Sequence, residues 1–266
     1  MTNEPRLACL CPTYKRPNCV ANVAACFLRQ TYPVDLRRLF VLDDAGQYRG
    51  ETKLTALGTH KYAGRIRVES YDSRYPTLPA KFDRLVELAK AEPDGWQPDA
   101  FVVWEDDDVF LPWHLQSIAD AILAGGQYLT SHTVHSTYEQ PMGDTILEGA
   151  DGRFHSSWAF TANLLNRVGG YPHTDRLDFD QQLGTALSSQ GGGPHLYSYP
   201  QGPPPSYVYR WGNGIYHGSQ QGEQGFRNLW SNLDQLPAPY VGTLEPNMDR
   251  ETTLLYRVLQ CDGLTV

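Results

Sequence analysis

The 266-residue chain has 22 Lys and Arg against 30 Asp and Glu, and its net charge of −8 argues against a broad nucleic-acid-binding surface. No stretch approaches the roughly 20 consecutive apolar residues of a membrane span, and the first residues lack a signal peptide's basic start and apolar run. The 5 cysteines fit neither a zinc spacing nor a disulfide framework, so we expect reduced thiols in a soluble cytoplasmic protein.

The first half of the chain alternates between predicted strands and predicted helices. Apolar runs that end in proline or in acids predict strands at residues 6–14, 36–46 and 100–108. Apolar residues at helical spacing predict helices over residues 18–30, capped by Asn18, over 79–91, and from Pro112 onward. This alternation predicts an α/β fold with a Rossmann-like, mostly parallel sheet flanked by helices.

The alternation fails after residue 124, and the second half is expected to be mixed. Strands are predicted near residues 127–134 and 206–211, and helices near 178–189 and 248–260. A stretch rich in Gly, Pro and aromatic residues lies between them, and long loops of this kind are often functional. We interpret the chain as one domain, residues 1–266, whose second half (125–266) binds an acceptor and whose first half (1–124) binds a donor.

Polar clusters follow the three predicted strands of the first half: "PTYKR", "DDAG" and "EDDD". Ligands of open α/β sheets bind beyond the carboxyl ends of the strands, where these clusters should meet. The run from Glu105 to Asp108 is flanked by apolar residues on both sides, which leaves little room for a loose exposed loop. Two like charges 4 Å apart repel by about 4 kcal/mol near a protein surface, so a bound cation is expected. Oxygen ligands favour Mn²⁺ or Mg²⁺.

Four segments in order, "CPTYKRP", "VLDDAG", "WEDDDVFLPWHL" and "VGGYPHTDRLDFDQQL", resemble the family 2 type of nucleotide-sugar-dependent glycosyltransferases. The resemblance covers residues 6–190 and implies the GT-A fold. It also implies that Asp107 is the metal ligand and Asp106 the ribose or metal-shell residue, with Glu105 or Asp108 as alternatives if the register shifts. The other implied nucleotide-sugar contacts are Pro12, Thr13, Tyr14 and Arg16 in the first turn. Asp43 or Asp44 would form a hydrogen bond with the nucleobase.

The same resemblance implies a catalytic base for an inverting transfer, a carboxylate that follows a Gly-Gly-aromatic turn. Asp178 occupies the family's Asp position after "GGY", although Leu177 stands where the family has Glu. Asp180 is the alternative base and a candidate acceptor contact, and Asp178 could instead only cap the helix that follows it. The remaining candidates are His217 as a late metal ligand, and Trp158 and Trp211 as aromatic acceptor contacts.

These features predict a metal-dependent inverting glycosyltransferase with a nucleoside diphosphate sugar donor, expected to be UDP-linked. The acceptor would be a hydroxyl group of a glycan, a metabolite, a protein side chain or a hydroxymethylated DNA base. A Gln-x-x-Arg-Trp motif is missing, which argues against a processive polysaccharide synthase. The alternatives are a magnesium-dependent nucleotidyltransferase, although "CPTYKRPN" has no glycine for a phosphate loop, and a non-catalytic module that binds sugars or nucleotides.

Overall fold

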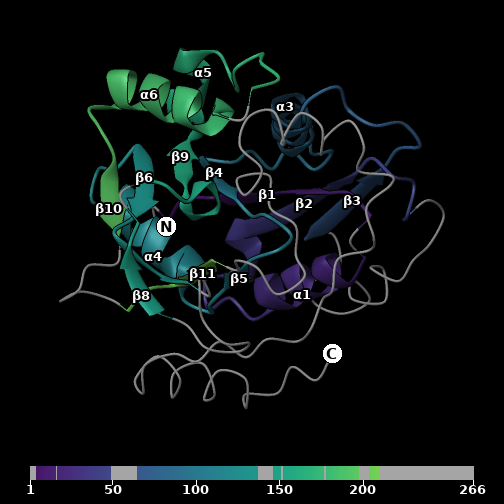
Figure 1. Cartoon of the computed structure of the whole chain (residues 1–266). Coiled ribbons are helices and arrows are strands. Elements are labelled where there is room, and N and C mark those ends of the chain that lie inside the picture. Colours follow the sequence, from purple (N-terminus) through teal and green to yellow (C-terminus); the bar gives the residue numbers. More distant parts are fainter. Residues whose placement is uncertain are drawn as a thin grey trace.

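The computed structural model describes residues 4–15, 17–48, 65–136, 146–150, 152–176, 178–197 and 204–209. Its largest element is a seven-stranded sheet in the order β10-β6-β9-β4-β1-β2-β3 (Figure 1). In this sheet only β9 runs antiparallel to its neighbours, which confirms the expected mostly parallel sheet. The strands are β1 (Leu7–Thr13), β2 (Arg37–Asp43), β3 (Ile66–Ser70), β4 (Ala100–Val103), β6 (Tyr128–Ser131), β9 (Ala159–Thr161) and β10 (His195–Tyr197).

Helices cover both faces of this sheet. Figure 1 shows α3, α5 and α6 on one face and α1 and α4 on the other. The helices are α1 (Pro17–Leu28), α3 (Leu78–Lys90), α4 (His114–Leu123), α5 (Ala162–Val168) and α6 (Phe179–Gly191), with 3₁₀ turns at Val34–Leu36 and His155–Ser157. None of the helices in the described part of the chain has the length and apolar character needed to cross a membrane.

The central strand β1 separates two apolar cores. Successive side chains of a strand point to opposite faces, so Leu7, Cys9 and Cys11 join the core under α1 and α4, while Ala8 and Leu10 join the core under α3, α5 and α6. The side chains of Cys9 and Cys11 are fully buried in this packing. Because both faces of β1 are sealed, its carboxyl end is held at a fixed place on the sheet edge.

Two helix starts differ from their predictions. Helix α1 begins at Pro17, so Asn18 lies in its first turn and cannot be its N-cap. Helix α4 begins at His114, two residues after Pro112. By contrast α3 has an ordinary cap, in which the Thr77 hydroxyl accepts a hydrogen bond from the backbone N–H of Ala80 at 3.3 Å.

A smaller sheet has the order β5-β11-β7-β8. Its strands are β5 (Val109–Phe110), β7 (Thr133–Ser136), β8 (Ile146–Gly149) and β11 (Tyr207–Tyr209). The single strand predicted near residues 127–134 is therefore two strands, β6 in the large sheet and β7 in the small one. Residues 104–108 connect β4 of the large sheet to β5 of the small sheet, so the acidic run is anchored at both ends. The helix predicted over residues 248–260 lies outside the described residues.

Candidate active site

The three predicted polar clusters meet at the carboxyl edge of the large sheet. In the parallel pairing of β1 with β2, Thr13 lies opposite Asp43, and Asp43 in turn lies opposite Ser70 of β3. On the other side of β1, Leu10 lies opposite Val103, two residues before Glu105. The shared register explains why turns far apart in the sequence form one site.

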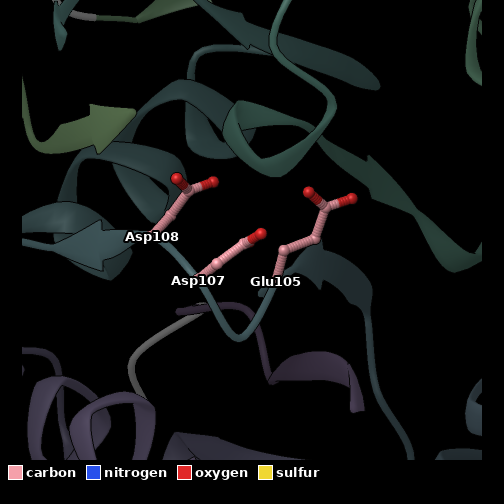
Figure 2. Close-up of side chains that lie close together, drawn as sticks. All are labelled: Glu105, Asp107 and Asp108. Carbon is pink, nitrogen blue, oxygen red and sulfur yellow. The ribbon is translucent and has the colours of Figure 1, made fainter. Parts of the chain in front are cut away.

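Three of the four acids after β4 face one another. Oxygen atoms of Glu105, Asp107 and Asp108 all lie within 4.8 Å of one another. Figure 2 shows these side chains projecting to the same side of the loop. Asp107 and Asp108 are 6% and 1% exposed, so their negative charges are largely withdrawn from water. A carboxylate-only set of this size suits a hard divalent cation, and it includes both of the register alternatives around Asp107.

The fourth acid, Asp106, points to a different partner. It accepts a hydrogen bond from the Thr13 hydroxyl at 2.7 Å, and both residues are buried. This bond joins the turn after β1 to the acidic loop. Asp106 is thus placed beside the predicted nucleotide turn, and the ribose contact proposed for it stays a prediction.

Neighbouring side chains fix the orientation of the outer two acids. Glu105 accepts a hydrogen bond from the Ser156 hydroxyl at 2.6 Å, and its other oxygen lies 2.9 Å from His155 Nδ1. Since a carboxylate only accepts, His155 Nδ1 donates to Glu105, and His155 Nε2 lies 3.4 Å from the Tyr171 hydroxyl. Tyr207 donates to Asp108 at 2.6 Å.

An aromatic layer supports the acidic loop from beneath. Trp104 is fully buried and stacks on Phe110, with 3.9 Å between the ring centroids. His114 contacts both rings, and burial lowers its pKa to about 3, so this histidine is a neutral part of the core. The loop is therefore built on a rigid, desolvated base.

The two acids after β2 are both engaged. Asp43 accepts hydrogen bonds from the backbone N–H groups of Ala45 and Gln47, at 2.9 and 2.6 Å, and from the Ser70 hydroxyl at 2.7 Å. This pattern is that of a turn-forming aspartate. The contact with the nucleobase that was predicted for Asp43 or Asp44 stays a prediction.

Asp44 forms an ion pair that the sequence analysis did not anticipate. Its carboxylate lies 2.5 Å from Lys81 Nζ, which also donates to the backbone carbonyl of Thr13 at 2.5 Å. Lys81 and Asp44 have side chains that are 2% and 1% exposed. Burial lowers the pKa of Lys81, and the nearby Asp44 opposes that shift. The pair ties α3 to the turns after β1 and β2.

The predicted nucleotide turn follows β1 directly. Pro12 and Thr13 are the last residues of the strand, and Tyr14 is 9% exposed. The Arg74 guanidinium lies 4.6 Å from the Tyr14 ring centroid. Lys15 has a left-handed backbone, with φ of 53°, which is uncommon for a residue with a side chain. Arg16 lies outside the described residues.

The "GGY" motif is a turn that places Tyr171 in the core beside α3. Gly169 ends α5 in the left-handed conformation with φ of 85°, and Gly170 follows with φ of 94°. A side chain at Gly170 would meet the Asp83 carboxylate at 2.9 Å, and this carboxylate accepts from the Tyr171 N–H at 2.9 Å. Tyr171 then stacks on Phe82, with ring centroids 4.8 Å apart.

The acceptor-side candidates differ in their surroundings. Asp178 stands at the N-cap position of α6 without making a side-chain cap bond, and Asp180 lies in the first turn. Trp158 is 1% exposed and contacts the rings of Tyr128 and His155, so it belongs to the core and a direct acceptor contact stays a prediction. His217 and Trp211 lie outside the described residues.

Sequence reasoning missed the residues that hold the acids in place, namely His155, Ser156, Tyr207 as the partner of Asp108, and Lys81. One signal was present for Lys81, because it shares a helical face with the apolar Leu85 and Leu88. The others act through contacts between distant segments, for which the sequence offers no spacing rule.

No protein-family model matches the chain, and no curated protein sequence matches it. Several solved structures are similar to it in fold. S. aureus TarS 1-349 in complex with UDP has a TM-score of 0.59 at 11% identity, covering 79% of this chain and 61% of its own. The mannosyltransferase PcManGT from Pyrobaculum calidifontis, in complex with GDP-Man and Mn²⁺, has a TM-score of 0.52 at 15% identity, covering 90% of this chain and 67% of its own.

The chain spans only about six tenths of the length of the TarS 1-349 structures. At these identities the likeness concerns the fold alone, and it agrees with the mostly parallel sheet and its helical layers. The chain therefore has the GT-A glycosyltransferase fold.

Proposed function

We propose that this protein transfers a sugar from a nucleoside diphosphate sugar to a hydroxyl acceptor, with inversion at the anomeric carbon and with the help of a divalent cation. The observation that carries the proposal is the meeting of the turn after β1 with the carboxylates of Glu105, Asp107 and Asp108 at one edge of a GT-A sheet. Structures of the same fold hold UDP, UDP-GlcNAc, and GDP-Man with Mn²⁺.

The carboxylates suit Mn²⁺ or Mg²⁺ by their chemistry and by their burial. Charges this close and this little exposed repel one another, and a divalent cation removes that cost. Glu105, Asp107 and Asp108 would hold the ion, oriented by the partners of the outer two. When bound, the cation would supply positive charge to the departing diphosphate. A contribution from His217 stays a prediction.

The residues of the strand ends would bind and orient the donor. Thr13 and Asp106, already joined by a hydrogen bond, lie between the nucleotide turn and the acids that would meet the diphosphate. Asp43 and Asp44 shape the turn where a nucleobase would lie, in a position fixed by Ser70 and Lys81. We keep UDP as the expected nucleotide.

The acceptor would approach from the side of α6. In an inverting transfer a carboxylate takes the proton of the attacking hydroxyl group. The resemblance of "GGY…RLDFD" to the family offers two candidates for that role, Asp178 and Asp180. A glycan, a metabolite, a protein hydroxyl or a hydroxymethylated DNA base all fit this chemistry.

The direct test incubates the protein with UDP- and GDP-sugars, Mn²⁺ and a panel of hydroxyl acceptors. We expect release of the nucleoside diphosphate that EDTA abolishes, and a product whose anomeric configuration, read by NMR, is opposite to that of the donor. Diphosphate release from a nucleoside triphosphate would indicate a nucleotidyltransferase instead. Nucleotide binding without turnover over the whole panel would indicate a binding module.

Ser156→Ala tests the support of Glu105. It removes the hydroxyl that donates to Glu105 at 2.6 Å, and loss of such an orienting partner typically weakens metal binding about 10- to 100-fold. We expect weaker Mn²⁺ binding by calorimetry, near the lower end of that range because His155 remains. Ser157→Ala is the matched control, since the Ser157 hydroxyl donates to the backbone carbonyl of Phe154 and does not touch Glu105. Equal losses in both variants would contradict the assignment.

A further inference from the structure

Helix α6 presents two carboxylates to different sides. Successive residues of an α-helix are turned by about 100°, so Asp178 and Asp180 point about 160° apart. The buried residues of this helix are Phe179, Leu183, Gly184 and Leu187. On the same helical count, Asp180 falls within the sector that they define and Asp178 falls opposite to it.

The Asp178 carboxylate lies at the surface, and both of its oxygens already accept hydrogen bonds. Its two oxygens accept hydrogen bonds from Arg176, at 2.9 Å from Nε and 3.2 Å from the second guanidinium nitrogen, and one also accepts from Gln182 at 3.0 Å. The Asp178 side chain is 44% exposed. The hydrogen bonds from Arg176 lower the pKa of Asp178. A carboxylate held by an arginine in this way is a weak proton acceptor.

Asp180 lies on the side of α6 that packs on the sheet. Its carboxylate accepts hydrogen bonds from the backbone and the side chain of the neighbouring Gln181, and no Lys or Arg in the described part of the chain forms an ion pair with it. Desolvation raises the pKa of Asp180; His155 acts against this shift, and the negative charge of Glu105 adds to it. Asp180 therefore lies close enough to His155 and Glu105 for their charges to affect its pKa.

The packing of α6 shows which of its sides faces the sheet. A side chain at Gly184, one turn after Asp180, would meet the Trp158 ring at 2.8 Å and the Tyr128 hydroxyl at 3.1 Å. Phe179 packs on His155, with 5.5 Å between ring centroids. The helix thus lies close against the sheet on this side.

Through His155, the start of α6 is connected to the candidate metal site. The His155 ring contacts Phe179 on one side, and its Nδ1 bonds to Glu105 on the other. Phe179, which lies between Asp178 and Asp180, is thus joined through His155 to Glu105 of the candidate metal site. The Asp178 carboxylate itself is bound by Arg176 and Gln182.

We propose that Asp180, rather than Asp178, is the general base of the transfer; this inference rests on the proposed function. The Asp180 carboxylate takes the proton of the acceptor hydroxyl as its oxygen forms a bond to the anomeric carbon. The bond between that carbon and the phosphate oxygen breaks, and its electron pair leaves with the nucleoside diphosphate. Asp178 is a surface residue that orders the start of α6 with Arg176.

Asp180→Asn and Asp178→Asn form a matched pair of isosteric variants on one helix. We expect Asp180→Asn to lower kcat by at least about a hundredfold, the usual contribution of a general base, while the Kd for the donor nucleotide stays within about threefold of wild type. Asp178→Asn should change kcat by less than about threefold. Because Asp180 has no cationic partner among the described residues, Asn at this position is expected to leave the thermal midpoint unchanged or higher.

The possible outcomes are distinct. Loss of turnover in Asp180→Asn and in Asp180→Ala, with donor binding kept and Asp178→Asn active, supports the proposal. Loss of turnover in Asp178→Asn alone, or an equal loss in both Asn variants, overturns it. If the wild-type protein binds no nucleotide and turns over no sugar donor, the proposed function itself fails. Turnover in wild type with full activity in Asp180→Asn contradicts only the assignment of the base.

Discussion

Asp107→Asn is expected to lower the turnover of nucleotide sugar by about a hundredfold or more and to weaken Mn²⁺ binding strongly. Asp107 belongs to the carboxylate group whose oxygens lie within 4.8 Å of one another, and it is 6% exposed. A cation that offsets charge on a departing diphosphate is worth several kcal/mol in the transition state, and each 1.36 kcal/mol is about tenfold in rate. Steady-state kinetics with and without EDTA, together with calorimetry, measure both effects.

Protein stability separates this loss from simple misfolding. Without metal, removing one of the repelling carboxylates should leave the thermal midpoint of Asp107→Asn equal to that of wild type or higher. With Mn²⁺ at about 100 times its Kd, wild type should gain about 2.7 kcal/mol, and the variant should gain little at that concentration.

Asp106→Asn is the comparison at the next position. Asp106 bonds to Thr13 and lies outside the carboxylate group, so its variant should keep most of the stabilisation by Mn²⁺. An equal loss of that stabilisation in Asp106→Asn would contradict the assignment of the metal to Glu105, Asp107 and Asp108.

Lys81→Met is expected to destabilise the folded protein by about 3–5 kcal/mol, the usual cost of removing one partner from a buried ion pair. The change leaves Asp44, 1% exposed, with a buried negative charge that keeps a hydrogen bond from the Tyr75 N–H at 2.9 Å. It also removes the donor to the carbonyl of Thr13. The free energy of unfolding in urea gives the measurement.

A second substitution tests the cause. Lys81→Met with Asp44→Asn removes both charges, so the double variant should recover part of the stability lost in Lys81→Met. Lys90→Met, on the same helix but at an exposed contact to Asn166, should change stability by no more than about 1 kcal/mol. A Lys81→Met variant as stable as Lys90→Met would show that the buried pair has little energetic role.

Strands β1, β2 and β4 could be predicted because each contains a run of apolar residues, and all three are buried along their whole length. Strand β3, which mixes apolar and charged residues at the edge of the sheet, was not predicted. The antiparallel strand β9 has three residues, and the two-residue β5 has even less local pattern. Such short strands are defined by pairing with distant segments, so periodicity could not reveal them.

The acids of the site could be predicted for a similar reason, and their supports could not. Asp107 lies within a run whose charge and apolar flanks are visible in the sequence. The bonds that orient its neighbours come from residues about 50 and 100 positions away, Ser156 to Glu105 and Tyr207 to Asp108. The opposite directions of Asp178 and Asp180 follow from helical geometry, but which side of α6 faces the sheet depends on tertiary packing.

The most direct test of the central claim is a calorimetric titration of the protein with UDP, with and without Mn²⁺. The nucleotide turn and the carboxylates lie at one edge of the sheet, joined by the hydrogen bond from Thr13 to Asp106. We therefore predict that Mn²⁺ tightens the binding of UDP to the wild-type protein and that Asp107→Asn abolishes this gain. Binding of UDP with the same Kd in both conditions, or no binding of UDP or GDP at all, would contradict the account.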